Sequence, residues 1–300
     1  MQYVQKIGDY QGIGSSVMTI GKFDGLHKGH QKLIDEVKRI AAGQDMQSIV
    51  FVFDMHMREQ IITNSERRIL LEKQVDYLVE CQFVEAIQHM EAEEFVAEIL
   101  IDRFKVKHLV VGDDFRFGYN RRGSVEFLKS YEKRGLFKVD VFAKEKYQGR
   151  DISSSYIKEV IPSGNMFLTN ALLGYPYTVI ETVVKGQQIG RQINVPTINL
   201  QPPAEKLLPK HGVYLCKTNV ARQWYDGVCN IGIKPTIANN HEVNIEVHLF
   251  GYEQEAYGDQ VVLRLLERVR GEQQFASLKE LQIQIQDDID NAKQYFSEAR

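Results

Sequence analysis

The chain has 300 residues, of which 43% are hydrophobic and 26% are charged, and its formal net charge is −3. This length provides about two domains with separate hydrophobic cores, and the composition is ordinary for a water-soluble globular protein. The small negative charge gives no electrostatic reason to expect a nucleic acid as a partner.

Cysteine usage and hydropathy exclude further classes of protein. Cys81, Cys216 and Cys229 are widely spaced, which fits neither a metal site nor a disulfide framework and indicates a reducing compartment. Residues 1–11 lack the basic and apolar regions of a secretory signal. No apolar run approaches the ~20 residues that a membrane span requires. We therefore expect a cytoplasmic protein that does not enter a membrane.

The first patterned stretch combines a strand, a turn and a helix. Residues 17–20, Val-Met-Thr-Ile, predict a short buried strand. A glycine-rich segment follows at residues 21–30 and contains His27 and His30. Apolar residues then recur at helical spacing, namely Leu33, Ile34, Val37, Ile40 and Ala41. The two histidines are therefore expected at the entrance of a helix.

That location favours phosphate binding. The first amides of a helix have no intrahelical partner and the helix dipole is positive there, so anions are stabilised. His27 and His30 can donate hydrogen bonds to phosphoryl oxygens, and the glycines allow the backbone to approach a phosphate closely. A lone His-x-x-His pair is more often an incidental feature of a tight turn. Here the flanking glycines and the strand-to-helix context favour the phosphate site.

The rest of the first half alternates between strands and helices, which predicts a doubly wound parallel sheet. Asp54 and His56 follow the second strand at its carboxyl end, where such sheets place their ligands. The expected strands are residues 48–53, 83–87, 107–112 and 137–143, and the expected helices are residues 65–79 with Ser65 as cap, 91–103 and 124–134.

Two loops of this half carry candidate binding residues. Residues 112–123 are rich in glycine, aromatic residues and arginine, which suits an aromatic ligand with a phosphate, although an ordinary crossover loop has equal weight. Residues 151–158 place three serines before a helix and Lys158 one turn inside it. Serine triplets are usually only caps and turns.

The second half has a different pattern. Residues 162–165 break a helix, and we expect a linker at residues 161–175 that includes a short helix. Successive strands with glycine-rich turns then predict a small antiparallel barrel, followed by an amphipathic helix at residues 277–299. The expected strands are residues 177–184, 213–219, 225–231, 243–250 and 260–269.

Residues 21–30, with the sequence Gly-Lys-Phe-Asp-Gly-Leu-His-Lys-Gly-His, resemble the His-x-Gly-His motif of nucleotidyltransferases. The Phe-Asp-Gly prefix resembles the form found in prokaryotic bifunctional riboflavin kinase/FMN adenylyltransferases. Six further segments resemble motifs of that family in the same order: residues 111–118, 151–158, 186–191, 195–200, 230–236 and 245–249. Residues 270–275 resemble its Arg-x-Glu-x-x-Phe segment.

For residues 1–160 the resemblance implies a Rossmann-like nucleotidyltransferase sheet that converts FMN and ATP to FAD and pyrophosphate. His27 and His30 would be the catalytic residues. The implied ATP-binding residues are Gly21, Phe23, Asp24, Gly29, Ser153, Ser154, Ser155 and Lys158, and the implied flavin-binding residues are Asp114, Phe115, Phe117 and Asn120.

For residues 176–300 the resemblance implies a Greek-key-type barrel with a C-terminal helix that phosphorylates riboflavin with ATP. Glu246 would be the general base. The implied ATP-binding residues are Gly186, Gly190, Thr197 and Asn199, of which Thr197 and Asn199 would also hold Mg²⁺, and Arg270 and Glu272 would bind the flavin. The substrates would be riboflavin, FMN and ATP; no feature of the sequence indicates an oligomeric state.

The chain departs from the family pattern at several positions. Lys158 and Tyr175 stand where arginine is usual, Asn194 stands where glycine is frequent, and Met55 and Met57 stand where prolines are frequent. One alternative is therefore a divergent copy that keeps only one of the two activities. Of the two, adenylyl transfer would be the one lost, because Lys158 replaces the usual arginine of the ATP-binding segment. Another is a non-catalytic flavin-binding regulator. Binding alone would not require all of the residues with implied catalytic or metal-binding roles, namely His27, His30, Thr197, Asn199 and Glu246, and their presence speaks against this alternative.

Overall fold

The computed structural model describes residues 1–55, 58–186, 195–234 and 242–298. The chain divides into two compact units, residues 1–154 and residues 155–300. Each unit has its own six-stranded β-sheet.

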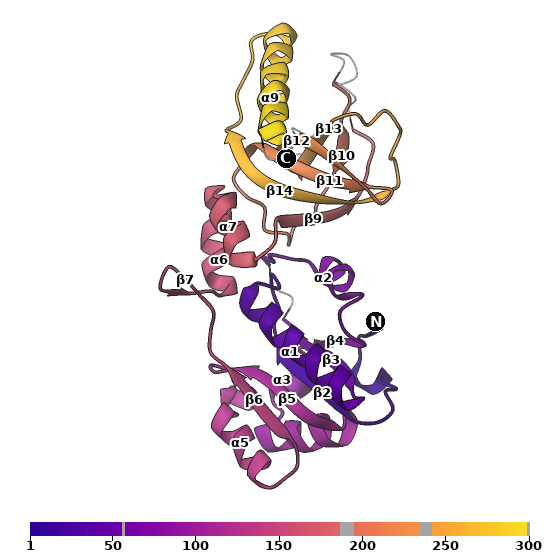
Figure 1. The fold of residues 1–300 in the computed structure, drawn as a ribbon, viewed down its shortest axis with the longest axis vertical. Coiled ribbons are helices and arrows are strands. Elements are labelled where there is room, and N and C mark those ends of the chain that lie inside the picture. Colours follow the sequence, from indigo (N-terminus) through magenta and orange to yellow (C-terminus); the bar gives the residue numbers. More distant parts are fainter. Residues whose placement is uncertain (56–57, 187–194, 235–241, 299–300) are drawn as a thin grey trace. The chain divides into compact units, whose positions relative to one another are not determined.

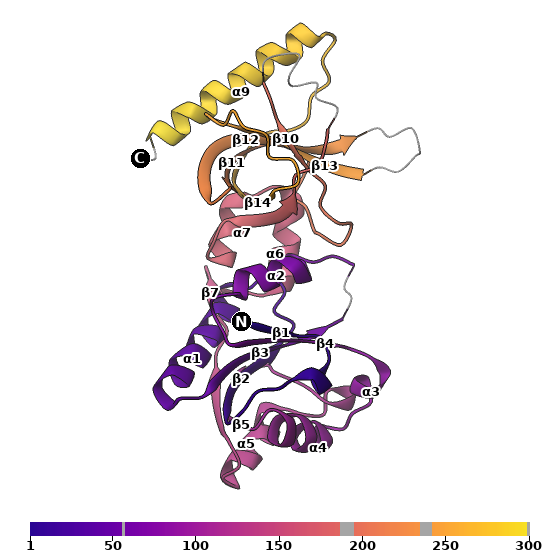
Figure 2. The ribbon, with the colours of Figure 1, turned by 90° about the vertical axis from the view of Figure 1, so that its right-hand side faces the viewer.

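The first unit contains a six-stranded parallel sheet with the order β1-β4-β3-β2-β5-β6. This confirms the predicted doubly wound sheet. Figure 1 labels β2 to β6 of this sheet, and Figure 2 labels β1. Its strands are β1 Gln2–Val4, β2 Ser16–Gly21, β3 Gln47–Asp54, β4 Tyr77–Gln82, β5 Val106–Gly112 and β6 Lys138–Phe142. A separate two-stranded ribbon follows, β7 Lys146–Tyr147 and β8 Arg150–Asp151.

Helices cover both faces of this sheet, as Figure 2 shows. Leu33 and Val37 of α1 pack with Val17 of β2 on one face, whereas Met18 faces a larger core that includes Phe95 and Leu128. The helices are α1 Lys28–Gln44, α2 Asn64–Leu71, α3 Glu85–Gln88, α4 Ala92–Glu94, the π-helix η2 Phe95–Arg103 and α5 Val125–Lys133, with 3₁₀ turns η1 Ile7–Asp9 and η3 Tyr119–Arg121. The α1 crossover leads from β2 to β3, and the α5 crossover leads from β5 to β6 on the other face. The strand order therefore reverses between β2 and β5, where open α/β sheets bind ligands.

One predicted helix was wrong at both ends. The cap of α2 is Thr63, which accepts a hydrogen bond from the Glu66 amide while the Glu66 carboxylate accepts from the Thr63 amide, so Ser65 is not the cap. The helix ends at Leu71, and β4 begins at Tyr77, so the strand predicted at residues 83–87 lies earlier. Leu71 and Leu78 are both buried, which made two separate elements resemble one helical face.

The second unit is an antiparallel six-stranded sheet with the order β10-β13-β12-β11-β14-β9. A bridge between Val184, just after β9, and Asn199 of β10 brings the two edge strands together. The sheet therefore curls into the predicted barrel (Figure 1). Its strands are β9 Tyr177–Thr182, β10 Ile198–Leu200, β11 Gly212–Val220, β12 Gln223–Lys234, β13 Glu242–Leu249 and β14 Gln260–Arg270.

Helices pack on this barrel at two places. Ile289, Ala292 and Phe296 of α9, Leu278–Glu298, share a buried cluster with β11 and β12. The segment expected as a linker contains the 3₁₀ turn η4 Ile161–Ser163 and the expected short helix, α7 Met166–Leu173. Asn170 of α7 donates to the carbonyl of Leu265 in β14. The unit begins with α6 Ser154–Val160, which starts at its boundary.

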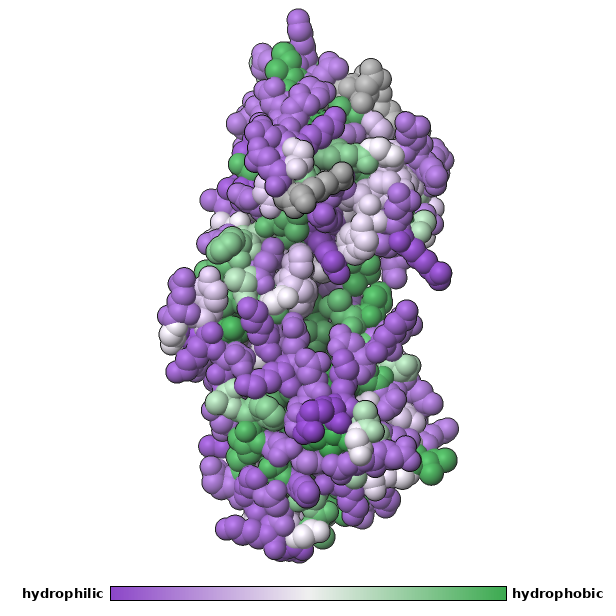
Figure 3. All heavy atoms as spheres, in the orientation of Figure 1, coloured by the Kyte–Doolittle hydropathy of each residue, from purple (hydrophilic) through white to green (hydrophobic). Residues whose placement is uncertain are grey.

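The face drawn in Figure 3 is mostly hydrophilic, with hydrophobic residues in separate patches. Among the described residues, no helix combines the length and hydropathy needed to cross a membrane.

Candidate active sites

The first site is built on the turn between β2 and α1. Phe23, Gly25 and Leu26 have φ angles of 47°, 90° and 42°, so the chain reverses sharply before the helix. Asp24 anchors this turn, because its Oδ1 accepts hydrogen bonds from the amides of Ile61 at 2.8 Å and Ile62 at 3.4 Å.

Gly25 fits its position for two reasons. Its positive φ is costly for other residues, and a β-carbon there would lie 3.0 Å from the Ile61 side chain. The turn therefore packs tightly on the segment that leads into α2.

His27 and His30 lie together at the start of α1, as the sequence predicts. His27 is the N-cap residue but makes no side-chain capping bond, so the first amides of the helix are left for another acceptor. The two imidazole rings stack with centroids 3.7 Å apart, and Phe23 packs on His30 at 4.9 Å. Nδ1 of each histidine is buried and has no hydrogen-bond partner among the described residues.

Burial keeps both histidines neutral near pH 7. It lowers the pKa of His27 from 6.5 to about 4. The pKa of His30 is lowered well below 6.5, first by burial and then by His27 and Arg67. A neutral imidazole has one N–H to donate and one nitrogen to accept. The pair can therefore hydrogen-bond to phosphate oxygens without carrying fixed positive charge.

A buried ion pair contacts the turn between β2 and α1 through Phe23. Arg67 and Glu80 are each 2% exposed and lie 2.6 Å apart. Nε of Arg67 also donates to the carbonyl of Phe23 at 3.4 Å, and its Nη1 donates to Asn64. Removing one partner of such a pair typically costs ~3–5 kcal/mol because the other charge stays buried. Sequence reasoning did not single out Arg67, whose partner is on another element.

The serine segment reaches the same turn through Ser154. Its Oγ donates to the carbonyl of Asp24 at 2.7 Å. Ser155 and Lys158 lie in α6, within the second unit.

The predicted flavin loop after β5 is partly structural. Phe117 is 4% exposed and packs in the core with Phe95, whereas Phe115 is half-buried and stacks on Phe117 at 5.5 Å. Asp114 is exposed and pairs with Lys144 at 2.8 Å, and Asn120 has a φ of 52°. The loop therefore presents Asp114, Phe115 and Asn120 to solvent, and Phe117 holds it to the sheet.

The second site is a cavity of about 290 Å³ in the barrel unit, covered by α9. Four predicted residues, Thr197, Glu246, Arg270 and Glu272, lie in its wall. The apolar part of the wall consists of Val195, Val213, Val228, Phe275, Leu281 and Ile285.

Polar residues form a row beside this cavity. Asn199 of β10 pairs with Glu246 of β13, and Glu246 pairs with Asn230 of β12. Asn244, which is 8% exposed, donates from Nδ2 to Asn199 Oδ1 at 3.2 Å and to Glu246 Oε1 at 3.3 Å. A β-carbon on Gly186 would overlap the Asn199 amide, so this glycine lets the chain pass against it. Sequence reasoning missed Asn244.

Two residues predicted to bind the flavin already have protein partners. Nε and Nη2 of Arg270 pair with both carboxylate oxygens of Asp288 in α9, at 2.6–3.1 Å. Asp288 is 4% exposed, so this pair holds α9 over the cavity. Glu272 Oε2 lies 3.5 Å from His211 Nδ1.

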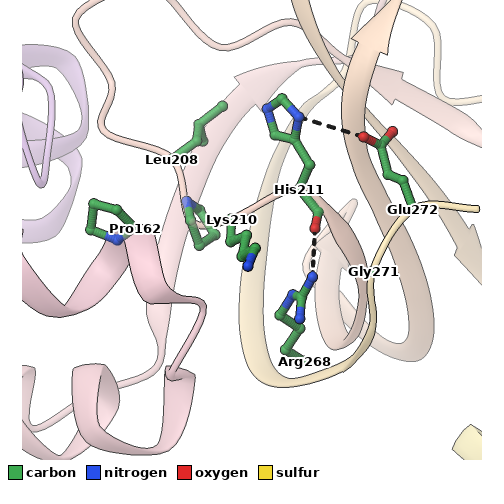
Figure 4. Close-up of a pocket in the computed structure, with 8 residues that line it drawn as sticks. Pro162, Leu208, Lys210, His211, Arg268, Gly271 and Glu272 are labelled. Atoms are coloured by element: carbon green, nitrogen blue, oxygen red, sulfur yellow. Dashed lines mark hydrogen bonds and ion pairs between the residues drawn. The ribbon is translucent and has the colours of Figure 1, made fainter.

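Glu272 also borders an open groove of about 720 Å³ (Figure 4). Figure 4 shows His211 between Arg268 and Glu272, with its carbonyl accepting from Arg268 Nη2 at 2.9 Å. Glu272 is therefore shared by the groove and the cavity.

A third hollow, of about 310 Å³, is lined by Ile198 of β10 and by Val247 and Leu249 of β13. Tyr252 and Tyr257 line it, and Thr197 lines both this hollow and the α9-covered cavity. Among the described residues, no group of three or more histidine, cysteine or acidic side chains is placed to hold a metal ion. Gly190, Asn194, His56 and Met57 lie outside the described residues.

Two family models match the chain in tandem. The FAD synthetase model matches residues 11–156 and the riboflavin kinase model matches residues 173–296. A bifunctional riboflavin kinase/FMN adenylyltransferase of Bacillus subtilis is 34% identical over 298 residues, which cover 95% of this chain and 94% of the relative. The protein of the same description from Pseudomonas fluorescens is 32% identical over 286 residues, covering 92% of each chain.

A solved structure is similar over nearly the same length. A crystal structure from Streptococcus pneumoniae, described as a macrolide-efflux protein, has a TM-score of 0.83 and 28% sequence identity, and the likeness covers 96% of both chains. The efflux description belongs to that protein. Sequence identity and coverage together show that this chain belongs to the bifunctional riboflavin kinase/FMN adenylyltransferase family.

Proposed function

We propose that the chain phosphorylates riboflavin with ATP to make FMN, and then transfers AMP from a second ATP to FMN to make FAD and pyrophosphate. We assign adenylyl transfer to the parallel-sheet unit and phosphoryl transfer to the barrel unit. The observation that carries the proposal is that the matching regions of the two family models each contain a built polar site. Because both regions contain such a site, neither a copy with one activity nor a non-catalytic regulator is favoured.

In adenylyl transfer, an oxygen of the FMN phosphate attacks the α-phosphorus of ATP. The bond from the α-phosphorus to the bridging oxygen breaks, and pyrophosphate leaves. His27 and His30 each donate one N–H to nucleotide phosphate oxygens, and the first amides of α1 donate alongside them. We assign Ser153, Ser154, Ser155 and Lys158 to the ATP phosphates, and the exposed face of residues 114–120 to the flavin.

In phosphoryl transfer, we assign the α9-covered cavity to riboflavin and the hollow beside Tyr252 to ATP. The apolar wall of the cavity suits an isoalloxazine ring. Because Thr197 lines both spaces, a flavin hydroxyl and a nucleotide phosphate held in them would meet beside it. Glu246 accepts the hydroxyl proton as the oxygen attacks the γ-phosphorus, and ADP leaves.

The donor set near Thr197 fits Mg²⁺. Asn199 Oδ1 and Glu246 Oε1 both accept a hydrogen bond from Asn244 Nδ2, at 3.2 and 3.3 Å, so the two oxygens lie near each other, and Mg²⁺ prefers oxygen ligands. Thr197 and Asn199 would hold the ion through their side-chain oxygens, and the ion would supply neutralisation of phosphate charge.

The test is to incubate the full chain with riboflavin, ATP and magnesium and to separate the flavins by chromatography. We expect FMN to appear first and FAD after it. Glu246→Gln should lower FMN formation by about 10²-fold but still convert supplied FMN to FAD. Glu267→Gln, at an exposed position of β14, is the matched control. Flavin binding without either product would overturn the proposal.

A further inference from the structure

Asn244 touches both of the oxygen atoms on which phosphoryl transfer would depend. It lies on β13, two positions before Glu246 and on the same face of the strand. Its Nδ2 carries two hydrogens, so it can donate to Asn199 Oδ1 and to Glu246 Oε1 at the same time. The side chain is 8% exposed, so water competes little for these bonds.

These contacts fix which way the Asn199 amide points. If that amide rotated by half a turn, its nitrogen would face the nitrogen of Asn244, and two donors would oppose each other. Gly186 limits movement from another direction, because its α-carbon packs against the Asn199 amide. Asn199 Oδ1 is therefore held in place relative to the Glu246 carboxylate.

We infer that Asn244 is a positioning residue for phosphoryl transfer, which aligns Asn199 Oδ1 and Glu246 Oε1 with respect to each other. The inference rests on the proposed riboflavin kinase activity of this site. Asn244 does not touch the reacting atoms in this role. It keeps a metal-binding oxygen and a general base in one geometry, and small misplacements of such groups cost large factors in rate.

Asn244→Leu removes both donor hydrogens at similar side-chain size. We expect kcat for riboflavin phosphorylation to fall at least tenfold, while the Kd for riboflavin, measured by flavin fluorescence, stays within twofold. Calorimetric titration with ADP should show that the gain in affinity from added magnesium shrinks several-fold. Asn244→Gln keeps the amide and should recover part of both losses.

The controls separate positioning from stability. Asn219→Leu makes the same change on β11 at a half-buried position, beyond the part of that strand that lines the cavity, and should leave kcat and the magnesium effect unchanged. If Asn244→Leu fails to fold, Asn244→Asp replaces it as the test variant, because an aspartate side chain has the size of asparagine but no donor hydrogens. In an Asn199→Ala background, Asn244→Leu should cost less than in the parent, because one of the two acceptors that Asn244 aligns is already gone.

Three results would overturn the inference: kcat within twofold of the parent, equal losses in Asn219→Leu, or fully additive losses in the double variant. If the parent makes no FMN, the proposed kinase activity fails instead. The ADP titration with and without magnesium then still tests whether Asn244 orients Asn199.

Discussion

The imidazole rings of His27 and His30 stack with centroids 3.7 Å apart and planes inclined by 19°. Two positive charges at that separation would repel each other, and burial penalises each charge further. The stack is therefore stable as a neutral pair, in which two ring faces pack together and the ring edges remain for hydrogen bonds.

His30→Ala should lower FAD formation from FMN at least 100-fold, because it removes one donor to the phosphates and leaves His27 without its stacking partner. FMN formation from riboflavin should stay within twofold. Initial rates of the two reactions, measured separately, check this. His89→Ala, at an exposed histidine of the same unit, is the control. Equal loss of both activities in a folded His30→Ala protein would show that the two sites are not separable.

The low pKa of His27 makes the first unit less stable in mild acid. Above pH 6.5 neither the folded nor the unfolded state is protonated at His27; between pH 6.5 and about 4 only the unfolded state takes up the proton. Folding stability is therefore lost as the pH falls through this window, by about 2 kcal/mol at pH 5 from His27 alone.

The matched variant is His27→Asn, which keeps a favourable N-cap residue. Its loss of stability between pH 7 and pH 5 should be smaller than that of the parent by about the same amount. Urea unfolding followed by circular dichroism measures this, while fluorescence of Trp224, the single tryptophan, records the barrel unit separately. Identical losses in parent and variant would contradict the buried, neutral His27.

A fragment of residues 165–300 should fold and phosphorylate riboflavin, whereas residues 176–300 should unfold at a lower temperature. Asn170 Nδ2 bonds to the Leu265 carbonyl and Asn170 Oδ1 accepts from the Tyr177 amide, so α7 is part of the barrel's packing. Removing α7 also exposes the surface that Leu172 and Leu173 cover, at ~2 kcal/mol per side chain. Thermal unfolding by Trp224 fluorescence and FMN production measure the difference; equal melting temperatures would contradict it.

Lys158→Arg should lower the KM for ATP in FAD formation by about 3–10-fold, because a guanidinium can contact a phosphate through two hydrogen bonds. Initial rates of FAD formation at saturating FMN give this KM. Lys133→Arg, at an exposed position of α5, should change nothing. A raised KM would mean that the phosphate contacts at this position are adapted to lysine.

Long, strongly patterned elements of the fold could be predicted from the sequence. The strands β3 and β5 and the helices α1 and α9 were expected within a few residues of their observed bounds. The three-residue strands β1 and β10 were missed, because so short a stretch carries no periodicity. For α2, Thr63 and Glu66 form a capping box that is visible in the sequence, and attention to it would have given the correct start.

In the candidate sites, residues that are close in the sequence could be predicted to lie together, whereas residues that meet only in the tertiary structure could not. His27 and His30 are close in sequence, so helical spacing alone places them together. Asn244 and Asn199 are 45 positions apart and meet only through the register of β10 and β13. Arg67 and Glu80 meet through the packing of α2 against the sheet. Such contacts depend on tertiary structure, and local patterns do not encode them.

The anchoring of the turn between β2 and α1 by Asp24 also provides a native reporter. The amide protons of Ile61 and Ile62 are bound by this one carboxylate, outside any regular ladder, and both residues are at most 1% exposed. Hydrogen exchange at these two amides therefore requires the turn and the segment before α2 to separate. Their exchange rates would report the opening of the turn directly, and ATP that holds the turn closed should slow both together.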